Sequence, residues 1–293
     1  GMAASPPTLD ALLPPEMALK AEQIGVNKTR QDWATTFVLA ILAGAFIALG
    51  AVFATTTLAG SASLPYGVAR LLAGLTFSLG LILVVVAGAE LFTGNNLIAM
   101  AWASRRVSTT QMLRNWAIVY TGNFVGALGT AALVYYGRQY TFGHGAVGST
   151  ALSIAAAKTS LGFGQAIALG ALCNALVCLA VWLCYSARTT TDKILAIIPP
   201  IAAFVAVGFE HSVANMYFIS FGLFVKGDHS FVASLPAAPD TSHLTWGHFL
   251  GSNLLPVTIG NILGGSVMVG AIYWFVYLRP ARGGNERKER WGP

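Results

Sequence analysis

Six long apolar stretches alternate with short polar segments along the chain. A helix needs about 20 mainly apolar residues to cross the hydrocarbon core of a bilayer, and every stretch reaches that length. The pattern therefore predicts an all-α membrane protein with six spanning helices, at 34–58, 71–103, 116–136, 159–186, 194–225 and 250–278. A short helix is also predicted at 14–25, because Pro15 suits a first turn and Gly25 an end. We expect it to pack beneath the spans, where it is placed to gate a passage.

Two of these stretches are too long for one crossing, since 71–103 and 194–225 run to about 33 and 32 residues. Each carries polar residues in its middle, GAELFTGN at 88–95 and GFEHSVAN at 208–215. Backbone freed by a helix break is tolerated at membrane depth only where protein buries it or a water-filled cavity meets it. We therefore predict that both helices are broken by an inserted loop.

The first break contains two polar side chains with different expected roles. Glu90 is expected to clamp the loop, by accepting from free N–H groups and capping the half-helix that follows. A direct substrate contact is less expected of it, because an uncompensated carboxylate repels anions. Thr93 lies at the tip of the break, where its hydroxyl either caps the half-helix or donates to a passing ligand.

The two breaks belong to an internal repeat. Glycine, glutamate and asparagine recur at matching positions of GAELFTGN and GFEHSVAN, and the following spans carry TGNFVG at 121–126 and IGNILG at 259–264. The chain therefore consists of two three-span repeats, at about 34–136 and 159–278, and an odd number of spans makes them inverted. Paired broken helices in an inverted repeat are the sequence pointer to a transport site near the midplane.

Composition and charge fit this topology. Hydrophobic residues make up 55% and charged residues 10% of the chain, and the mean hydropathy is +0.66, whereas a soluble domain carries about 25% charged residues. Thirteen of the 17 lysines and arginines fall before the first span, at 104–115, at 187–193 and after the last span. By the positive-inside rule both termini are cytoplasmic. The net charge of +6 thus reflects topology, and no nucleic-acid partner is expected.

The chain accordingly divides into a cytoplasmic N-terminal segment at 1–33, a six-span channel domain at 34–278 and a basic cytoplasmic tail at 279–293. The tail is expected to anchor on anionic membrane lipid.

Only one of the five histidines, His211, lies within a span, at the second break. A single histidine excludes bis-histidine haem and leaves zinc without its further ligands. The neighbours Glu210, His211 and Ser212 diverge on a helix and form no catalytic triad. We therefore expect no metal, no cofactor and no enzyme activity. A membrane redox enzyme would need paired histidines or cysteine clusters, and the three cysteines are expected to pack as apolar residues. What remains is one titratable donor in a pore.

The strings GAELFTGNN, GFEHSVANM, LPPEMALKAEQIGV and NLLPVTIGNILGG resemble the formate/nitrite transporter family, over about Leu12 to Arg279. Within it, SHLTWGHFLGSNLLPVTIGN and YWFVYLR are most similar to the formate channels. The chain differs at Glu90 and Gly94, where formate channels have Asp and Ser. The motif with Glu and Gly also occurs in the nitrite and hydrosulfide branches of the family. The resemblance implies an aquaporin-like protomer, one pore per subunit, a homopentamer and a place in the inner membrane.

The resemblance also implies site residues. The central site corresponds to Thr93, Asn174 and His211. Two apolar constrictions correspond to Phe77, Leu81 and Phe204 and to Leu91, Phe92 and Val177. For Phe77 and Leu81, ordinary packing would explain the residues equally well. The outer mouth corresponds to Lys158, Glu210 and Asn215.

The expected function is therefore transmembrane passage of formate and similar small monovalent anions. Lys158 would concentrate anions at the mouth, and His211 would hydrogen-bond the carboxylate or lend it a proton. Channel and proton-coupled carrier differ only in whether that proton travels. Nitrite or hydrosulfide is the alternative substrate. An aquaporin-like neutral-solute pore is the distant alternative, because the two Asn-Pro-Ala motifs it needs at the breaks do not occur.

Overall fold

A computed structural model of the chain describes residues 10–280, and all of its regular elements are helical. The elements are α1 (Pro14–Arg30), α2 (Trp33–Leu58), η1 (Ser61–Ser63), α3 (Tyr66–Phe77), α4 (Leu79–Ile82), η2 (Leu83–Gly88), α5 (Phe92–Asn95), η3 (Asn96–Ile98), α6 (Ala99–Ala103), α7 (Thr109–Tyr136), η4 (Gln139–Thr141), α8 (Ala146–Thr159), α9 (Phe163–Ser186), α10 (Thr190–Val207), α11 (Ser212–Gly227), α12 (His229–Ser234), η5 (His248–Leu254), α13 (Leu255–Ile262), η6 (Leu263–Ala271) and η7 (Trp274–Leu278). Apart from Arg279, whose guanidinium lies 3.9 Å from the Phe275 ring centroid, and the adjoining residue 280, the predicted basic tail lies outside the described residues.

Six helical runs of the described chain are long and apolar enough to cross a membrane. They are α2, the run 66–88, α7, α9, α10 and the run 248–278. The prediction of six spans and two broken helices is confirmed. The first long stretch stops at Gly88 and resumes with α5, and the second stops at Gly208, the residue after α10, and resumes with α11.

Several helices extend beyond the apolar stretches because capping residues in the polar flanks supply their first turn. Asp32 caps α2, its carboxylate accepting from the Thr35 N–H at 2.9 Å. Ser108 and Gln111 form a capping box at the start of α7, a motif that satisfies two of the free N–H groups at a helix start. Hydropathy alone does not detect these polar first turns. The predicted start of α7, at 116, is therefore seven residues too late.

Two short helices differ from the sequence prediction. The segment 137–158, expected to be a loop, contains α8. The N-terminal helix α1 runs on to Arg30 instead of ending near Gly25. Gly25 does not end α1 but lets it pack closely, since a Cβ there would lie 3.1 Å from the Ala101 Cβ. A short helix thus precedes each repeat, α1 the first and α8 the second.

The spans pack through small residues, as expected where lipid supplies no hydrophobic drive between helices. A Cβ on Gly126 of α7 would lie 1.9 Å from the Ile41 carbonyl oxygen of α2. In the second repeat, a Cβ on Gly264 would lie 2.0 Å from the Ala171 carbonyl oxygen of α9. These two glycines come from the matching TGNFVG and IGNILG regions, so the same close crossing of first and third span occurs in both repeats.

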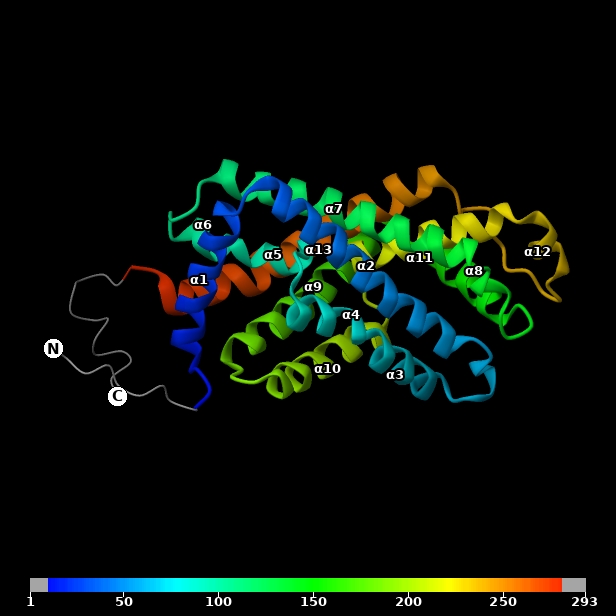
Figure 1. The fold of residues 1–293 in the computed structure, drawn as a ribbon, viewed down its shortest axis with the longest axis horizontal. Coiled ribbons are helices and arrows are strands. Elements are labelled where there is room, and N and C mark those ends of the chain that lie inside the picture. Colours follow the sequence, from blue (N-terminus) through cyan, green and yellow to red (C-terminus); the bar gives the residue numbers. More distant parts are fainter. Residues whose placement is uncertain (1–9, 281–293) are drawn as a thin grey trace.

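The arrangement of elements follows the inverted repeat. α1 and α6 lie at one end of the long axis and α8 and α12 at the other, while α5, α9 and α13 lie near the middle (Figure 1). The two breaks therefore meet in the interior of the protomer, where residues of both repeats come together.

Candidate functional site

Each break begins at a glycine in the left-handed region, Gly88 at φ 92° and Gly208 at φ 84°. A side chain is strained there, so glycine is the residue that ends a helix in this way. The backbone then becomes extended, and it re-enters a helix after Leu91 in the first break and after His211 in the second. Each loop is therefore only a few residues long, and its second half, Glu90 and Leu91 in the first break and Glu210 and His211 in the second, is buried.

Asn123 holds the first loop. Its amide Nδ2 donates to the Glu90 carbonyl oxygen at 2.9 Å and to the Ala40 carbonyl oxygen at 2.7 Å. Its Oδ1 accepts from the Phe92 N–H at 2.9 Å. One side chain thus pairs with both the Glu90 carbonyl and the Phe92 N–H of the loop. Asn123 therefore takes the capping role that was expected of Glu90.

Asn261 holds the second loop in the same way. Its Nδ2 donates to the Glu210 and Gly170 carbonyl oxygens at 3.0 and 2.8 Å, and its Oδ1 accepts from the Ser212 N–H at 2.8 Å. Asn123 and Asn261 are the shared asparagines of TGNFVG and IGNILG. The internal repeat in the sequence predicted the match between these asparagines but not their function. The same amide side chain at equivalent positions after two broken helices was the signal that could have indicated a loop clamp.

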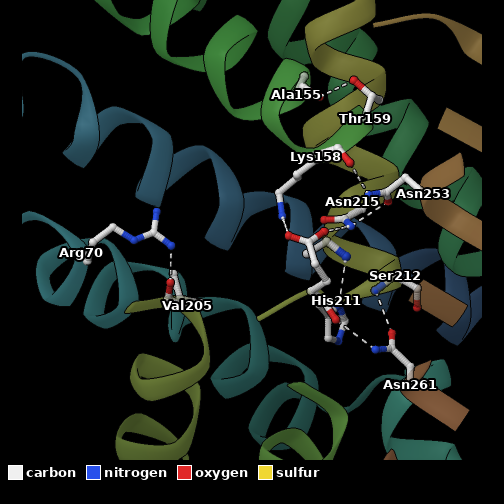
Figure 2. Close-up of polar contacts among 12 residues, drawn as sticks. Arg70, Ala155, Lys158, Thr159, Val205, His211, Ser212, Asn215, Asn253 and Asn261 are labelled. Atoms are coloured by element: carbon white, nitrogen blue, oxygen red, sulfur yellow. Dashed lines mark hydrogen bonds and ion pairs between the residues drawn. The ribbon is translucent and has the colours of Figure 1, made fainter. Parts of the chain in front are cut away.

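The two loop carboxylates are ion-paired rather than bonded to the free backbone. The Glu90 carboxylate accepts from Lys28 Nζ at 2.8 Å and from Asn95 Nδ2 at 2.7 Å. The Glu210 carboxylate accepts from Lys158 Nζ at 2.8 Å and from Asn215 Nδ2 at 2.6 Å (Figure 2). The predicted Lys158, Glu210 and Asn215 therefore meet, and Lys28 forms the equivalent pair in the first repeat.

A further asparagine ties each pair to its short helix. Asn253 accepts from Asn215 Nδ2 at 2.9 Å and donates to the Lys158 carbonyl oxygen at 2.8 Å. Asn115 accepts from Asn95 Nδ2 at 3.0 Å in the first repeat. Lys28 was missed because α1 was predicted to end before it, and no periodicity in the sequence connects residue 28 with residue 90.

His211 and Thr93 face one another across the two breaks, with Nε2 and Oγ1 2.9 Å apart. His211 Nδ1 accepts from the Ala214 N–H at 3.0 Å, so this nitrogen carries no proton. We therefore assign the proton of the neutral imidazole to Nε2, which donates to the Thr93 hydroxyl. The hydroxyl keeps its own proton free to donate onward. Both side chains are buried, Thr93 completely.

Asn174 supports this pair but lines neither of the two cavities described below. Its Nδ2 is close to three acceptors, the Thr93 carbonyl oxygen at 3.1 Å, Asn96 Oδ1 at 2.8 Å and the Asn261 carbonyl oxygen at 2.7 Å. Of the three predicted central residues, Thr93 and His211 touch directly, and Asn174 fixes the backbone beneath Thr93.

Two cavities lie beside the two breaks, one lined by His211 and the other by Gly94, which adjoins Thr93. The Lys158 vestibule has a volume of about 400 Å³, and its lining includes His211 and three charged residues, Arg70, Lys158 and Glu210. The Lys28 vestibule has a volume of about 350 Å³, and its charged lining residues are Lys28 and Glu90. Each cavity is a concave, mostly apolar space with a few convergent polar groups, as small-molecule sites are.

Four of the six predicted constriction residues line these cavities. Phe77 and Phe204 line the Lys158 vestibule, with ring centroids 5.6 Å apart in an edge-to-face contact. Leu81 and Leu91 line the Lys28 vestibule. The other two lie aside from both linings. Phe92 packs edge-on against Tyr120 and Trp116 at centroid distances of 5.0 and 6.2 Å, and Val177 is buried in the core.

Metal-ligating residues do not converge anywhere in residues 10–280, where no group of three or more His, Cys, Asp or Glu side chains is placed to hold an ion. Cys173, Cys178 and Cys184 are free and buried. The arrangement offers hydrogen-bond donors and paired charges along an apolar path, which suits the binding and passage of a small polar solute.

Comparison with known proteins identifies relatives over almost the whole chain. A family model described as formate/nitrite transporter matches residues 15–275. The chain is 46% identical over 273 residues to the formate channel FocA of Escherichia coli strain K12, covering 92% of this chain and 96% of that protein. It is 44% identical over 263 residues to FocA of Haemophilus influenzae, covering 89% and 93%. A solved pentameric formate channel with formate bound superposes with a TM-score of 0.80 at 44% identity, covering 84% of this chain and 98% of that one.

Proposed function

This chain belongs to the formate/nitrite transporter family, and we propose that it is a membrane channel for formate and similar small monovalent anions. We further propose a homopentamer with a separate pore in each protomer, held in the inner membrane with both termini cytoplasmic. The named relatives are formate channels, and a solved relative is pentameric with formate bound. The distribution of lysine and arginine supports the orientation.

The observation that carries this proposal is the Thr93–His211 pair between two cavities, each with its own lysine–glutamate pair. A carboxylate that leaves water for an apolar space loses strong hydrogen bonds, at a large cost in free energy unless donors replace them. Lys158 and Lys28 supply charged donors at the two ends. The Thr93 hydroxyl and the His211 N–H supply neutral ones in the middle. The anion thus meets a donor in each part of its path.

The assigned tautomer limits what His211 does. With its proton on Nε2, the neutral imidazole donates a hydrogen bond to formate but has no proton to transfer. Transfer requires a second proton on Nδ1 first, and this displaces the Ala214 N–H, which is one of the free donors at the start of α11. We propose that His211 acts as a hydrogen-bond donor, to the Thr93 hydroxyl in this conformation and to formate when the anion displaces that contact. Proton coupling then depends on release of the Ala214 contact.

The proposal is tested by flux into liposomes that contain the purified protein, with formate, nitrite, hydrosulfide, chloride and glycerol compared. Formate should pass readily and glycerol should not. Nitrite or hydrosulfide passing much faster than formate would shift the substrate to the alternative. Glycerol flux equal to formate flux would overturn the anion pore. The mass of the detergent-solubilised protein tests the assembly, because a stable monomer would contradict the homopentamer.

The role of His211 is tested by substitution, with flux measured between about pH 5 and pH 8. His211→Asn keeps a neutral donor and should retain part of the flux without its pH dependence. His211→Phe removes the donor and should lose both. His248→Asn, at a histidine remote from the breaks, is the control and should leave the pH profile unchanged. Wild-type rates and a wild-type profile in His211→Phe would reduce the histidine to a packed residue.

A further inference from the structure

The two vestibules differ in formal charge. In the Lys28 vestibule the charges of Lys28 and Glu90 cancel. In the Lys158 vestibule those of Lys158 and Glu210 cancel likewise, but Arg70 also lines the cavity, so the sum is one positive charge with His211 neutral. Arg70 plays no part in the path described above. Its position raises the question of what an extra guanidinium does at this mouth.

Arg70 reaches from α3 to the end of α10. Its Nε donates to the Ala206 carbonyl oxygen at 3.2 Å and its Nη2 to the Val205 carbonyl oxygen (Figure 2). These carbonyls belong to the last turn of α10, where few N–H groups remain to pair with them; the Val205 carbonyl oxygen also accepts from the Gly208 N–H at 3.2 Å. They also form the negative end of the helix dipole. The guanidinium therefore caps a helix end that would otherwise turn partial negative charge toward the cavity.

This cap lies directly beside the second break. Val205 and Gly208 line the same cavity as Arg70, and a Cβ on Gly208 would lie 3.9 Å from Arg70 Nη2. The first break lacks such a cap. Within residues 10–280 no side chain donates to a carbonyl of η2, and the cap is a backbone bond from the Ala89 N–H to the Val84 carbonyl oxygen at 2.9 Å. The two half-channels are thus alike in their lysine–glutamate pairs and unlike in their helix ends.

We propose that Arg70 is a positioning residue that makes the Lys158 vestibule an anion-holding site with a higher affinity than the Lys28 vestibule. It acts by cancelling the negative end of α10 and by leaving the cavity one positive charge in excess. The chemistry it selects is a small monoanion, formate included. This inference rests on the proposed anion pore.

The difference between the two vestibules should appear in the formate concentration that half-saturates the flux. It should not appear in the slope of flux against concentration at low concentration. A passive pore with equal conditions on both sides must carry equal flux in the two directions at low substrate concentration. A deeper anion site on one side instead lowers the half-saturation concentration measured from that side. Such a site is also weakened by salt, since mobile ions screen charges that water reaches.

The experiment measures formate uptake against concentration in right-side-out and inside-out membrane vesicles, at low and high ionic strength. Arg70→Gln removes the charge, and Arg70→Lys keeps the charge but loses the forked donor geometry. Arg138→Gln is the matched control, because Arg138 lines a separate pocket with His144 and Asp228. Each variant is first checked for assembly and thermal stability.

Arg70→Gln should raise the half-saturation concentration about fivefold from the Lys158 side at low ionic strength, with less than a twofold change from the other side. High salt should shrink the difference, and Arg70→Lys should recover most of the wild-type value. If Arg70→Gln does not assemble, the wild type decides, because its half-saturation from the Lys158 side should rise more with salt.

Two failures are distinguishable. Wild-type vesicles without saturable formate flux above that of empty vesicles would overturn the proposed function itself. Wild-type flux with equal half-saturation from the two sides, or an Arg70→Gln variant identical to wild type, would overturn the role of Arg70 alone. A change of the same size in Arg138→Gln would also overturn it, because the effect would then follow overall surface charge.

Discussion

Replacing Glu210 with glutamine should make the Lys158 vestibule hold anions too tightly. The Glu210 carboxylate lies 2.8 Å from Lys158 Nζ, and the two side chains are 6% and 15% exposed. A glutamine can still accept from Asn215, but it no longer neutralises the ammonium. An anion bound on the free side of Lys158 would no longer be repelled by a carboxylate about 5 Å away. At an effective dielectric constant of about 20, that repulsion is about 3 kcal/mol.

Water in the cavity screens part of this energy, and about half of it corresponds to a roughly tenfold change in affinity. Glu210→Gln should therefore lower the half-saturation concentration for formate about tenfold and also lower the maximal flux, because release becomes slow. Lys158→Met should do the opposite to half-saturation by leaving the carboxylate unpaired, and removing one partner of a buried pair costs about 3–5 kcal/mol of stability. The double variant should lie between them.

The assay is formate flux in liposomes for the two single variants and the double variant, with thermal stability measured in parallel. The double variant isolates the interaction between the pair from the effect of each residue. A Glu210→Gln protein that still folds and assembles, but whose half-saturation stays the same or rises, would refute the reasoning. In that case the pair would merely fasten α8 to the loop of the second break, and anions would not bind at Lys158.

Three further outcomes are expected. Asn261→Leu leaves the polar groups of the second loop without a partner, at about 1–3 kcal/mol for each buried group, so thermal melting should fall and formate flux should be lost; an unchanged melting curve would contradict the clamp. Gly126→Ala puts a Cβ 1.9 Å from the Ile41 carbonyl oxygen and should cost about 1–3 kcal/mol by forcing α2 and α7 apart, visible as a lower melting temperature. The Tyr140 hydroxyl, with other donors, lowers the pKa of Asp228 to about 2, so this carboxylate adds stability above its usual pKa that is lost as the pH falls through about 2. Tyr140→Phe should move that loss of stability to higher pH in an acid titration. An unshifted titration would mean that this hydrogen bond is not made in solution.

The spans and the breaks could be predicted from the sequence because the bilayer imposes a length. Extra tilt absorbs part of the excess in a stretch of about 33 residues, but the polar residues in its middle make a helix broken there the better explanation. The same rule says nothing of α8, a 14-residue helix of small residues that is too short to span and carries no cap signal. Its end point matters, because it carries Lys158. The matching end of α1 carries Lys28, which hydropathy also failed to place.

The site was predictable in residue type but not in contact. Thr93 and His211 were recognisable as polar residues at two breaks, yet their 2.9 Å contact joins two repeats that no local pattern relates in space. Asn174 was expected to face substrate, whereas its amide nitrogen lies against backbone and side-chain oxygens of α5, η3 and α13. Which way an amide points depends on packing around it, and packing is not legible in a single sequence.

The asparagine clamps and lysine–glutamate pairs at the two breaks also bear on whether the path has a preferred direction. Turned upside down, the framework of asparagine clamps and ion pairs would look almost the same, so it sets no preferred direction of flow. Polarity resides only in residues without a counterpart, such as His211, which occupies the place that Leu91 has in the first loop, and Thr93, which occupies that of Val213. Residues at the centre and at the mouths that differ between the two repeats are therefore what gives the path different properties on its two sides.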